Sequence, residues 1–189
     1  MLFYIQITTS FILPIFTVNL SNTFNLNEST IALIFTTNQL VSAFTAVLAA
    51  KVATVSRRRW ISALGCLIIT LSIFLMGPSK ILELPNSFQL ILIAMFVNGI
   101  GLSFVFIHVT PEVIRSVCEK KGIKVGSNTQ LNERASTLFE FTFSFGQCVG
   151  PPIGGAIADN IGYRNSMDVV ALFSVICGLV SIFALLIKK

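Results

Sequence analysis

The chain alternates between long apolar segments and short polar connections. Six segments are mostly apolar, and they lie approximately at 2–22, 29–50, 60–78, 87–110, 135–158 and 168–187. Each is close to the roughly 20 residues that an α-helix needs to cross the hydrocarbon core of a bilayer. The pattern predicts an all-α membrane protein with a single domain, 1–189, built as a six-transmembrane-helix bundle.

The composition supports a lipid environment. Hydrophobic residues make up 54% of the chain, charged residues make up 11%, and the mean hydropathy is +0.85. A soluble domain typically carries about 25% charged residues. We therefore expect the lipid bilayer to be the main partner of this surface.

Basic residues gather in alternate connections. One side of the predicted bundle holds Lys51, Arg57, Arg58, Arg59, Arg115, Lys120, Lys121, Lys124, Arg134, Lys188 and Lys189, whereas the other holds Lys80 and Arg164. Basic loops favour the cytoplasmic side. The distribution predicts that both termini and the basic connection 112–134 are cytoplasmic, in a vesicle or a plasma membrane. The first part of 112–134 is either an interfacial amphipathic helix that ends at the turn Gly126–Asn128 or a solvated connector.

This topological cause also accounts for the net charge of +5, and the basic stretches contain no aromatic stacking platform, so we expect no nucleic-acid partner. The four cysteines lack metal-ligand spacing, and no nucleotide-binding loop or catalytic constellation is visible. His108 is expected to have a structural role. We predict no enzyme activity, no metal site and no cofactor; a membrane-embedded enzyme would require a catalytic cluster that only folding could assemble.

Polar residues recur inside the predicted spans. In the fifth span, Glu140, Ser144, Gln147 and Pro151 lie along one helix face. Glu140 is either a proton-carrying or cation-binding group, or a side chain that reaches the cytoplasmic interface and pairs with cations near Arg134.

Polar positions in other spans repeat the pattern. They are Asn38, Ser42 and Thr45 in the second span, Asn98 in the fourth, and Gln6, Thr8 and Thr9 in the first. Any one of them could serve only to bond neighbouring helices. Their presence in four of the six spans favours a polar cavity.

The stretch GQCVGPPIGG, Gly146 to Gly155, combines small residues with two prolines. Gly146, Gly150 and Gly154 recur at every fourth position, so a neighbouring helix can approach this face closely. Pro151 and Pro152 each remove a backbone donor, and this predicts a bend in the helix.

This stretch resembles the Gly-x-x-x-Gly-Pro-x-x-Gly-Gly signature of major facilitator superfamily antiporters. The residues that follow, AIADNIGYR with Asp159, Gly162 and Arg164, are similar to the tail often found at the outer end of that helix. In detail the chain is similar to the C-terminal six-helix half of the vesicular amine transporter-like branch. One departure is Leu13, where that branch often carries an acidic residue before the proline of its seventh helix.

The resemblance implies transport of a small solute by alternating access, with proton-coupled antiport as the expected mode and an organic cation as one candidate solute. It requires a second six-helix half, either an N-terminal half or another protomer. The implied pathway residues are Glu140, Gln147, Asn98, Asn38 and Ser42. The implied gating-helix residues are Gly146, Gly150, Pro151, Pro152, Gly154, Gly155, Asp159 and Arg164. The resemblance implies that this helix packs at the interface between the two halves and shapes which side opens. The alternative is a half-length interaction or regulatory protein, or a fragment, without transport activity of its own.

Overall fold

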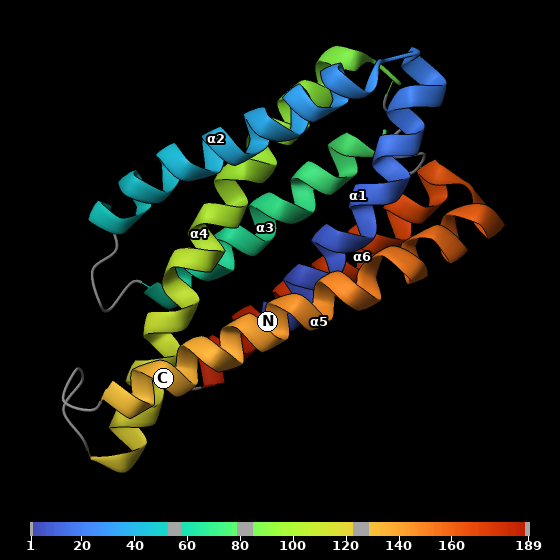
Figure 1. Cartoon of the computed structure of the whole chain (residues 1–189). Coiled ribbons are helices and arrows are strands. Elements are labelled where there is room, and N and C mark those ends of the chain that lie inside the picture. The colour runs from blue at the N-terminus through green and yellow to red at the C-terminus, as the bar shows by residue number, and fades with distance from the viewer. Residues whose placement is uncertain (1, 53–57, 79–84, 123–128, 188–189) are drawn as a thin grey trace.

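The computed structural model describes residues 2–52, 58–78, 85–122 and 129–187. These residues form six α-helices and no β-strand, which confirms the predicted all-α bundle (Figure 1). The helices are α1 Leu2–Phe24, α2 Glu28–Val52, α3 Arg58–Met76, α4 Phe88–Lys121, α5 Thr129–Ile161 and α6 Tyr163–Ile187.

The helices pack as two groups that are joined along one side. In the first group α1 lies along α5, and in the second α4 packs against both α2 and α3. α6 lies between the two groups: it packs mainly against α3 and also touches α1 and α5 (Figure 1). By contrast, α1 touches α2 little and α4 touches α5 little, so the bundle is loosely closed between the pair α1–α5 and the pair α2–α4.

Glycines bring α4 close to both of its neighbours. A Cβ atom added to Gly99 would lie 2.7 Å from the carbonyl oxygen of Asn38 on α2, and one added to Gly101 would lie 2.8 Å from the side chain of Ile69 on α3. Such close backbone approach is the usual role of small residues in membrane helix packing. These contacts fix α4 between α2 and α3.

The region expected as a basic connection, 112–134, is largely helical. α4 continues to Lys121 and ends at Gly122, whose φ of 64° is the left-handed conformation that glycine adopts readily at a helix C-terminus. α5 then begins at Thr129. The first part of this region therefore extends α4 instead of forming a separate interfacial helix, because the glycine that ends the helix stands ten residues after 112.

Two other predictions concern the connections: the structure corrects one of them, and the other falls on residues that it does not describe. The expected gap between the last two spans, 159–167, is reduced to Gly162, whose φ of 81° turns the chain from α5 into α6. The turn predicted at 126–128 and the basic residues Arg57, Lys80, Lys124, Lys188 and Lys189 lie outside the described residues.

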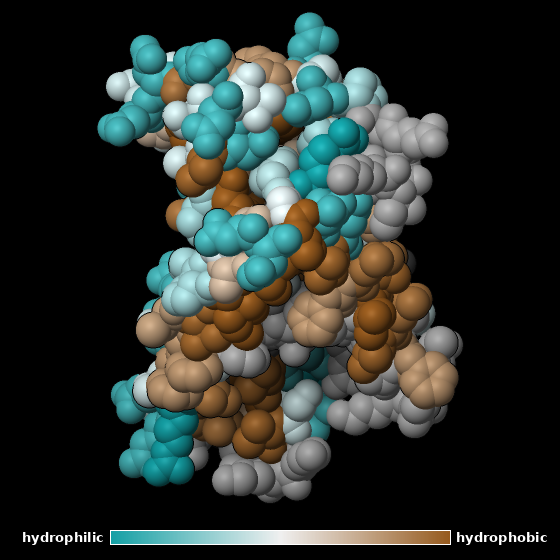
Figure 2. All heavy atoms as spheres, turned by 90° about the vertical axis from the view of Figure 1, so that its right-hand side faces the viewer, coloured by the Kyte–Doolittle hydropathy of each residue, from teal (hydrophilic) through white to brown (hydrophobic). Residues whose placement is uncertain are grey.

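The surface of the bundle is rich in apolar side chains. Large hydrophobic residues more than half exposed include Phe44, Phe141 and Phe183. Figure 2 shows hydrophobic residues over much of one face, with hydrophilic residues gathered at the end that holds the α1–α2 connection. Three described helical stretches are long and apolar enough to cross a membrane: Glu28–Lys51, Phe88–Glu119 and Tyr163–Val180. Exposed apolar surface on this scale fits a multi-pass membrane protein, since lipid replaces water around it.

Candidate functional site

A cavity lies between the two helix groups, where α1 and α5 face α2 and α4. Its volume is about 440 Å³. It is lined by Gln6, Thr9, Ser10, Leu13, Gln39, Ser42, Leu102, Phe106, Phe143, Gln147 and Pro151. We call this space the central cavity. It has the size of a small-molecule site.

The lining of the central cavity combines polar and apolar side chains, and none of the lining residues is charged. Three amides, Gln6, Gln39 and Gln147, lie among the hydroxyl groups of Thr9, Ser10 and Ser42. These groups can donate and accept hydrogen bonds without carrying a fixed charge. The cavity is therefore suited to neutral or hydrogen-bonding parts of a solute.

Gln6 has unused hydrogen-bonding capacity at this cavity. Its side chain is 4% exposed, and its Nε2 atom donates to Ser10 Oγ over 3.4 Å. The Oε1 atom is buried and has no partner among the described residues. An unpaired buried acceptor is costly, so this oxygen is available to a donor that enters the cavity.

A smaller chamber of about 60 Å³ adjoins the central cavity and contains Asn38 and Asn98. Asn38 Nδ2 donates to Met95 O over 2.8 Å and to Asn98 Oδ1 over 3.2 Å. Asn98 Nδ2 in turn donates to Ser72 Oγ over 2.8 Å. Both asparagines, expected as pathway residues, therefore also link α2, α4 and α3.

Ser42 belongs to the central cavity and to the α2–α4 contact. Ser103 Oγ on α4 lies 2.8 Å from Ser42 O, its hydrogen-bond acceptor, and 3.3 Å from Ser42 Oγ. The structure thus brings together Ser42 and Gln147, two of the predicted pathway residues, from opposite groups of helices.

Glu140 lies apart from the cavity lining. It is exposed on α5, and within the described residues it makes no ion pair, including with Arg134. Its helix face also carries Gln147, about two turns further along α5, and Pro151, about three turns further along. Glu140 therefore lies on the same face of α5 as the cavity-lining residues but does not itself line the cavity.

The glycine face of α5 packs on α1 of the same chain. Added Cβ atoms would lie 2.8 Å from Gln6 Cβ at Gly146, 2.6 Å from Ser10 Cβ at Gly150, and 2.5 Å from Phe11 O at Gly154. The helix that this stripe approaches is therefore α1 of the same chain, whereas the family resemblance implies packing at the interface with a second half. Gly155 has nothing within 4 Å of such an atom.

The two prolines stand in different surroundings. α5 is one continuous helix through both residues. Pro151 lines the central cavity, whereas Pro152 is exposed.

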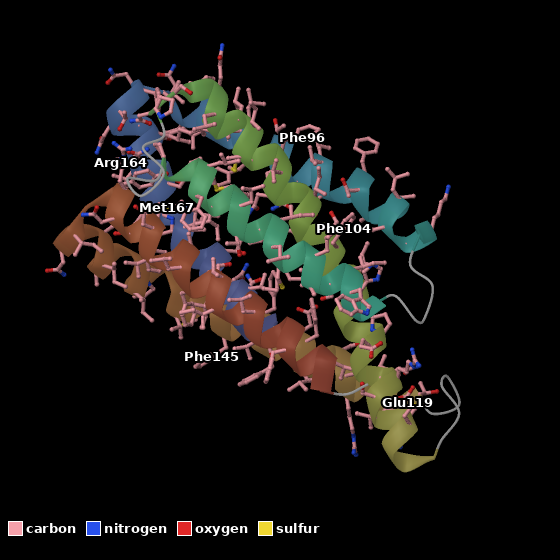
Figure 3. The ribbon with its side chains drawn as sticks, turned by 180° about the vertical axis from the view of Figure 1, so that it is seen from behind. Phe96, Phe104, Glu119, Phe145, Arg164 and Met167 are labelled. Atoms are coloured by element: carbon pink, nitrogen blue, oxygen red, sulfur yellow. The ribbon has the colours of Figure 1, made fainter. Side chains whose placement is uncertain are left out.

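Asp159 and Arg164, the last two residues of the predicted gating motif, serve different contacts. Arg164 Nε donates to Pro78 O over 2.7 Å, and the neighbouring Tyr163 hydroxyl donates to Met76 O over 2.8 Å. Figure 3 shows Arg164 and Met167 together at this end of the bundle. Arg164 therefore ties the start of α6 to the end of α3, while Asp159 is exposed on α5.

The aromatic wall of the cavity is the part that sequence reasoning missed. Phe106 of α4 and Phe143 of α5 meet at a ring-centroid distance of 6.3 Å, across the gap between the two groups. The chain contains 17 phenylalanines, and the sequence does not distinguish those that line the cavity from those that face lipid. The only signal was the position of Phe143 one turn before Gln147.

Comparison with known proteins shows the wider relationship. A family model described as Major Facilitator Superfamily matches residues 1–189. The chain is similar to the MFS-type transporter SLC18B1 of Homo sapiens, with 29% identity over 122 residues that cover 65% of this chain and 26% of that protein. It is also similar to the protein of the same name from Rattus norvegicus, with 26% identity over 121 residues that cover 64% and 26%. The matched region is about a quarter of the length of these relatives.

Proposed function

Because the chain belongs to the Major Facilitator Superfamily, we propose that it moves a small solute across a membrane as the C-terminal half of a secondary transporter. The observation that carries this proposal is the central cavity, a space of about 440 Å³ that six uncharged polar side chains help to line within an apolar bundle. Polar groups at membrane depth are costly unless they face a cavity or a solute path. The similar proteins are also named as transporters.

We further propose that a second six-helix half covers the central cavity. Gln39 and Gln147 line the cavity yet are exposed in this chain, and so is Glu140 on the same side of α5. Three such side chains would be unfavourable against lipid tails. An N-terminal half or another protomer would enclose them, and rocking of the two halves would open the cavity to one side at a time.

The residue roles follow from position. Gln147, Ser42 and the unpaired oxygen of Gln6 would contact solute. Asn38 and Asn98 would line the adjoining chamber and keep α2, α3 and α4 together around it. Glu140 would exchange protons near the end where α4 meets α5, the end that carries most basic residues and would face the cytoplasm. This arrangement supports proton-coupled antiport.

The contact between the glycine face of α5 and α1 suggests how gating would occur. Gly146, Gly150 and Gly154 would let α5 and α1 move as one closely packed pair, with Pro151 beside the cavity. Two helices in backbone contact would transmit a tilt together, because tightly packed interfaces do not deform gradually.

A proteoliposome experiment tests the proposal. The chain is reconstituted with a trapped pH-sensitive dye, a pH gradient is imposed, and the proton flux above that of protein-free liposomes is followed as small amines and neutral amides are added in turn. We expect one solute class to elicit flux that Glu140→Gln reduces at least tenfold, because a glutamine carries no proton. Gln147→Leu should raise the solute concentration needed for half-maximal flux.

Matched changes at the start of α5 are the controls. Glu133→Gln and Gln130→Leu alter exposed side chains outside the cavity and should leave the flux unchanged. Solute-driven flux that is insensitive to Glu140→Gln would remove Glu140 from the mechanism. A chain that elicits no flux alone or with a co-reconstituted second half would instead favour a regulatory protein.

A further inference from the structure

A second cavity lies along the contact of α1 and α5, towards the α5–α6 turn. Its volume is about 290 Å³. The polar residues that line it are Asn19 and Asn22 of α1 and Asp159 of α5, together with Tyr163 at the start of α6. We call it the end cavity. None of its lining residues belongs to the central cavity.

Asp159 supplies a charge that the central cavity lacks. Its carboxylate is exposed, and it forms no ion pair or hydrogen bond with the residues that the structure describes. Arg164, the nearest basic residue in sequence, donates to Pro78 O instead. The end cavity therefore presents a carboxylate that a cation can approach.

Asn19 adds a donor whose partner is missing. Its Oδ1 atom accepts from Thr23 Oγ1 over 3.0 Å. Its Nδ2 atom is shielded from solvent and has no acceptor among the described residues. Since a buried N–H group without a partner is costly, the site is suited to a ligand that brings an oxygen to this nitrogen.

The remaining walls are apolar and leave room for a ligand body. Pro14, Ile15, Val18 and Ala158 line the cavity, and Gly155 faces it with nothing within 4 Å of an added Cβ atom. A ligand that places an ammonium group at Asp159 and an oxygen near Asn19 would rest its carbon skeleton here. An inorganic cation would leave these apolar walls unused.

The end cavity lies further along α1 and α5 than the central cavity. Leu13 and Pro151 line the central cavity, while Pro14 and Gly155 line the end cavity. The two sets are one residue apart on α1 and about one helical turn apart on α5. A solute that leaves the central cavity towards the α5–α6 end would reach this site next.

We propose that the end cavity is a second solute site, which binds the ammonium group of an organic cation at Asp159 and a neighbouring oxygen of that cation at Asn19. As a station on a transport path the site rests on the proposed function, but its occupancy can be measured by binding alone. It would collect or release the solute at the end of the bundle opposite most of the basic residues.

Binding is tested with the full chain in nanodiscs of phosphatidylcholine. Equilibrium dialysis measures 2-amino-1-phenylethanol, with empty nanodiscs as background. We expect saturable binding that weakens about tenfold or more in Asp159→Asn, because a hydrogen-bonded charge pair is lost. Gly155→Leu should abolish binding, since leucine fills the cavity. Asn19→Leu should remove the preference for this probe over 2-phenylethylamine, which lacks the hydroxyl group.

Matched controls separate these effects from general charge and size. Glu133→Gln removes one carboxylate from the other end of α5, and Ala156→Leu adds the same side chain at an exposed neighbouring position. Both should bind within about twofold of the unchanged chain. The neutral 1-phenyl-1,2-ethanediol should compete weakly, and sodium chloride should not displace the probe differently from potassium chloride at equal ionic strength.

Each contrary result has a distinct meaning. Equal binding in Asp159→Asn and the unchanged chain would overturn the site, and if Gln147→Leu alone then weakens binding, the probe occupies the central cavity and the proposed function stands. Specific displacement by sodium would reassign the site to an inorganic cation. Loss of binding when phosphatidylethanolamine is added to the nanodiscs would assign the site to a lipid head group; either result overturns the proposal.

Discussion

At the residue scale, one amide joins three helices inside the bundle. Asn98 on α4 accepts from Asn38 on α2 and donates to Ser72 on α3, and it is 7% exposed. The sequence identified Asn98 only as a polar residue within an apolar span. The structure shows that its amide holds the second group of helices together beside the small chamber. A structural and a pathway role are compatible here, because one surface of the network faces the chamber.

The cost of losing this network can be measured. Asn98→Leu keeps the branched shape of the side chain but removes the oxygen that accepts from Asn38 and the amide that donates to Ser72. We expect the free energy of unfolding to fall by about 1–2 kcal/mol, the upper range for hydrogen bonds between membrane helices. Reversible unfolding in mixed detergent micelles provides the measurement, and Asn132→Leu, at an exposed position of α5, serves as control. Equal stability of both variants would show that the network contributes nothing.

At the element scale, α1 and α5 form a single closely packed unit. The glycine stripe of α5 lets the α1 backbone approach so closely that any side chain at these positions meets atoms of α1. The adjacent glycine, Gly155, faces the open end cavity instead. Glycines of one motif therefore have different physical roles. Gly146, Gly150 and Gly154 allow α1 to pack closely, whereas Gly155 leaves space for the end cavity.

Alanine substitutions should separate these roles. In Gly154→Ala the new methyl group meets Phe11 O at 2.5 Å, so α1 and α5 must separate, and overpacking of this kind typically costs about 1–3 kcal/mol. In Gly155→Ala the methyl group meets nothing, and the better helix propensity of alanine should be neutral or stabilise by up to about 1 kcal/mol. Unfolding in mixed micelles distinguishes the two. Destabilisation of equal size at both positions would contradict the packing role of Gly154.

At the scale of the whole molecule, the bundle has two kinds of exposed surface. Apolar side chains cover the outside, as Figure 3 illustrates for Phe96 of α4 and Phe145 of α5, which point away from the helices. Polar side chains such as Gln39 and Gln147 line the central cavity between the helix groups. The first surface fits lipid, whereas the second fits water, solute or a second half.

Chemical labelling in a bilayer distinguishes these surfaces. With the native cysteines replaced, Gln39→Cys should react with a water-soluble maleimide, because position 39 is exposed at the central cavity and the reagent reaches it through water. Leu40→Cys, next to it but about 100° around α2, should stay unreactive in lipid. The rate of labelling in proteoliposomes provides the measurement. Rapid labelling at both positions would mean that α2 does not face lipid on its Leu40 side.

The sequence alone determined the class of this protein. Long apolar segments predicted six helices, because only helices can satisfy their backbone groups within a short lipid-spanning segment. The Gly-Pro signature predicted the superfamily, which the match over residues 1–189 confirms. Helix ends were less accurate: the connection expected at 112–134 is mostly helix, since the fall in hydropathy marks the membrane surface and not the end of a helix.

Only the tertiary structure decided which polar residues meet. Periodicity placed Gln147 and Glu140 on one face of α5. The central cavity reaches Gln147 but ends before Glu140, and only the packing of the helix pairs decides this. The glycine stripe required a close neighbour, and packing identified that neighbour as α1. The end cavity had no sequence signal, and the aromatic pair Phe106 and Phe143 had only the position of Phe143 one turn before Gln147. Local periodicity fixes the direction in which a side chain points on its own helix, whereas its partners depend on contacts between segments far apart in the chain.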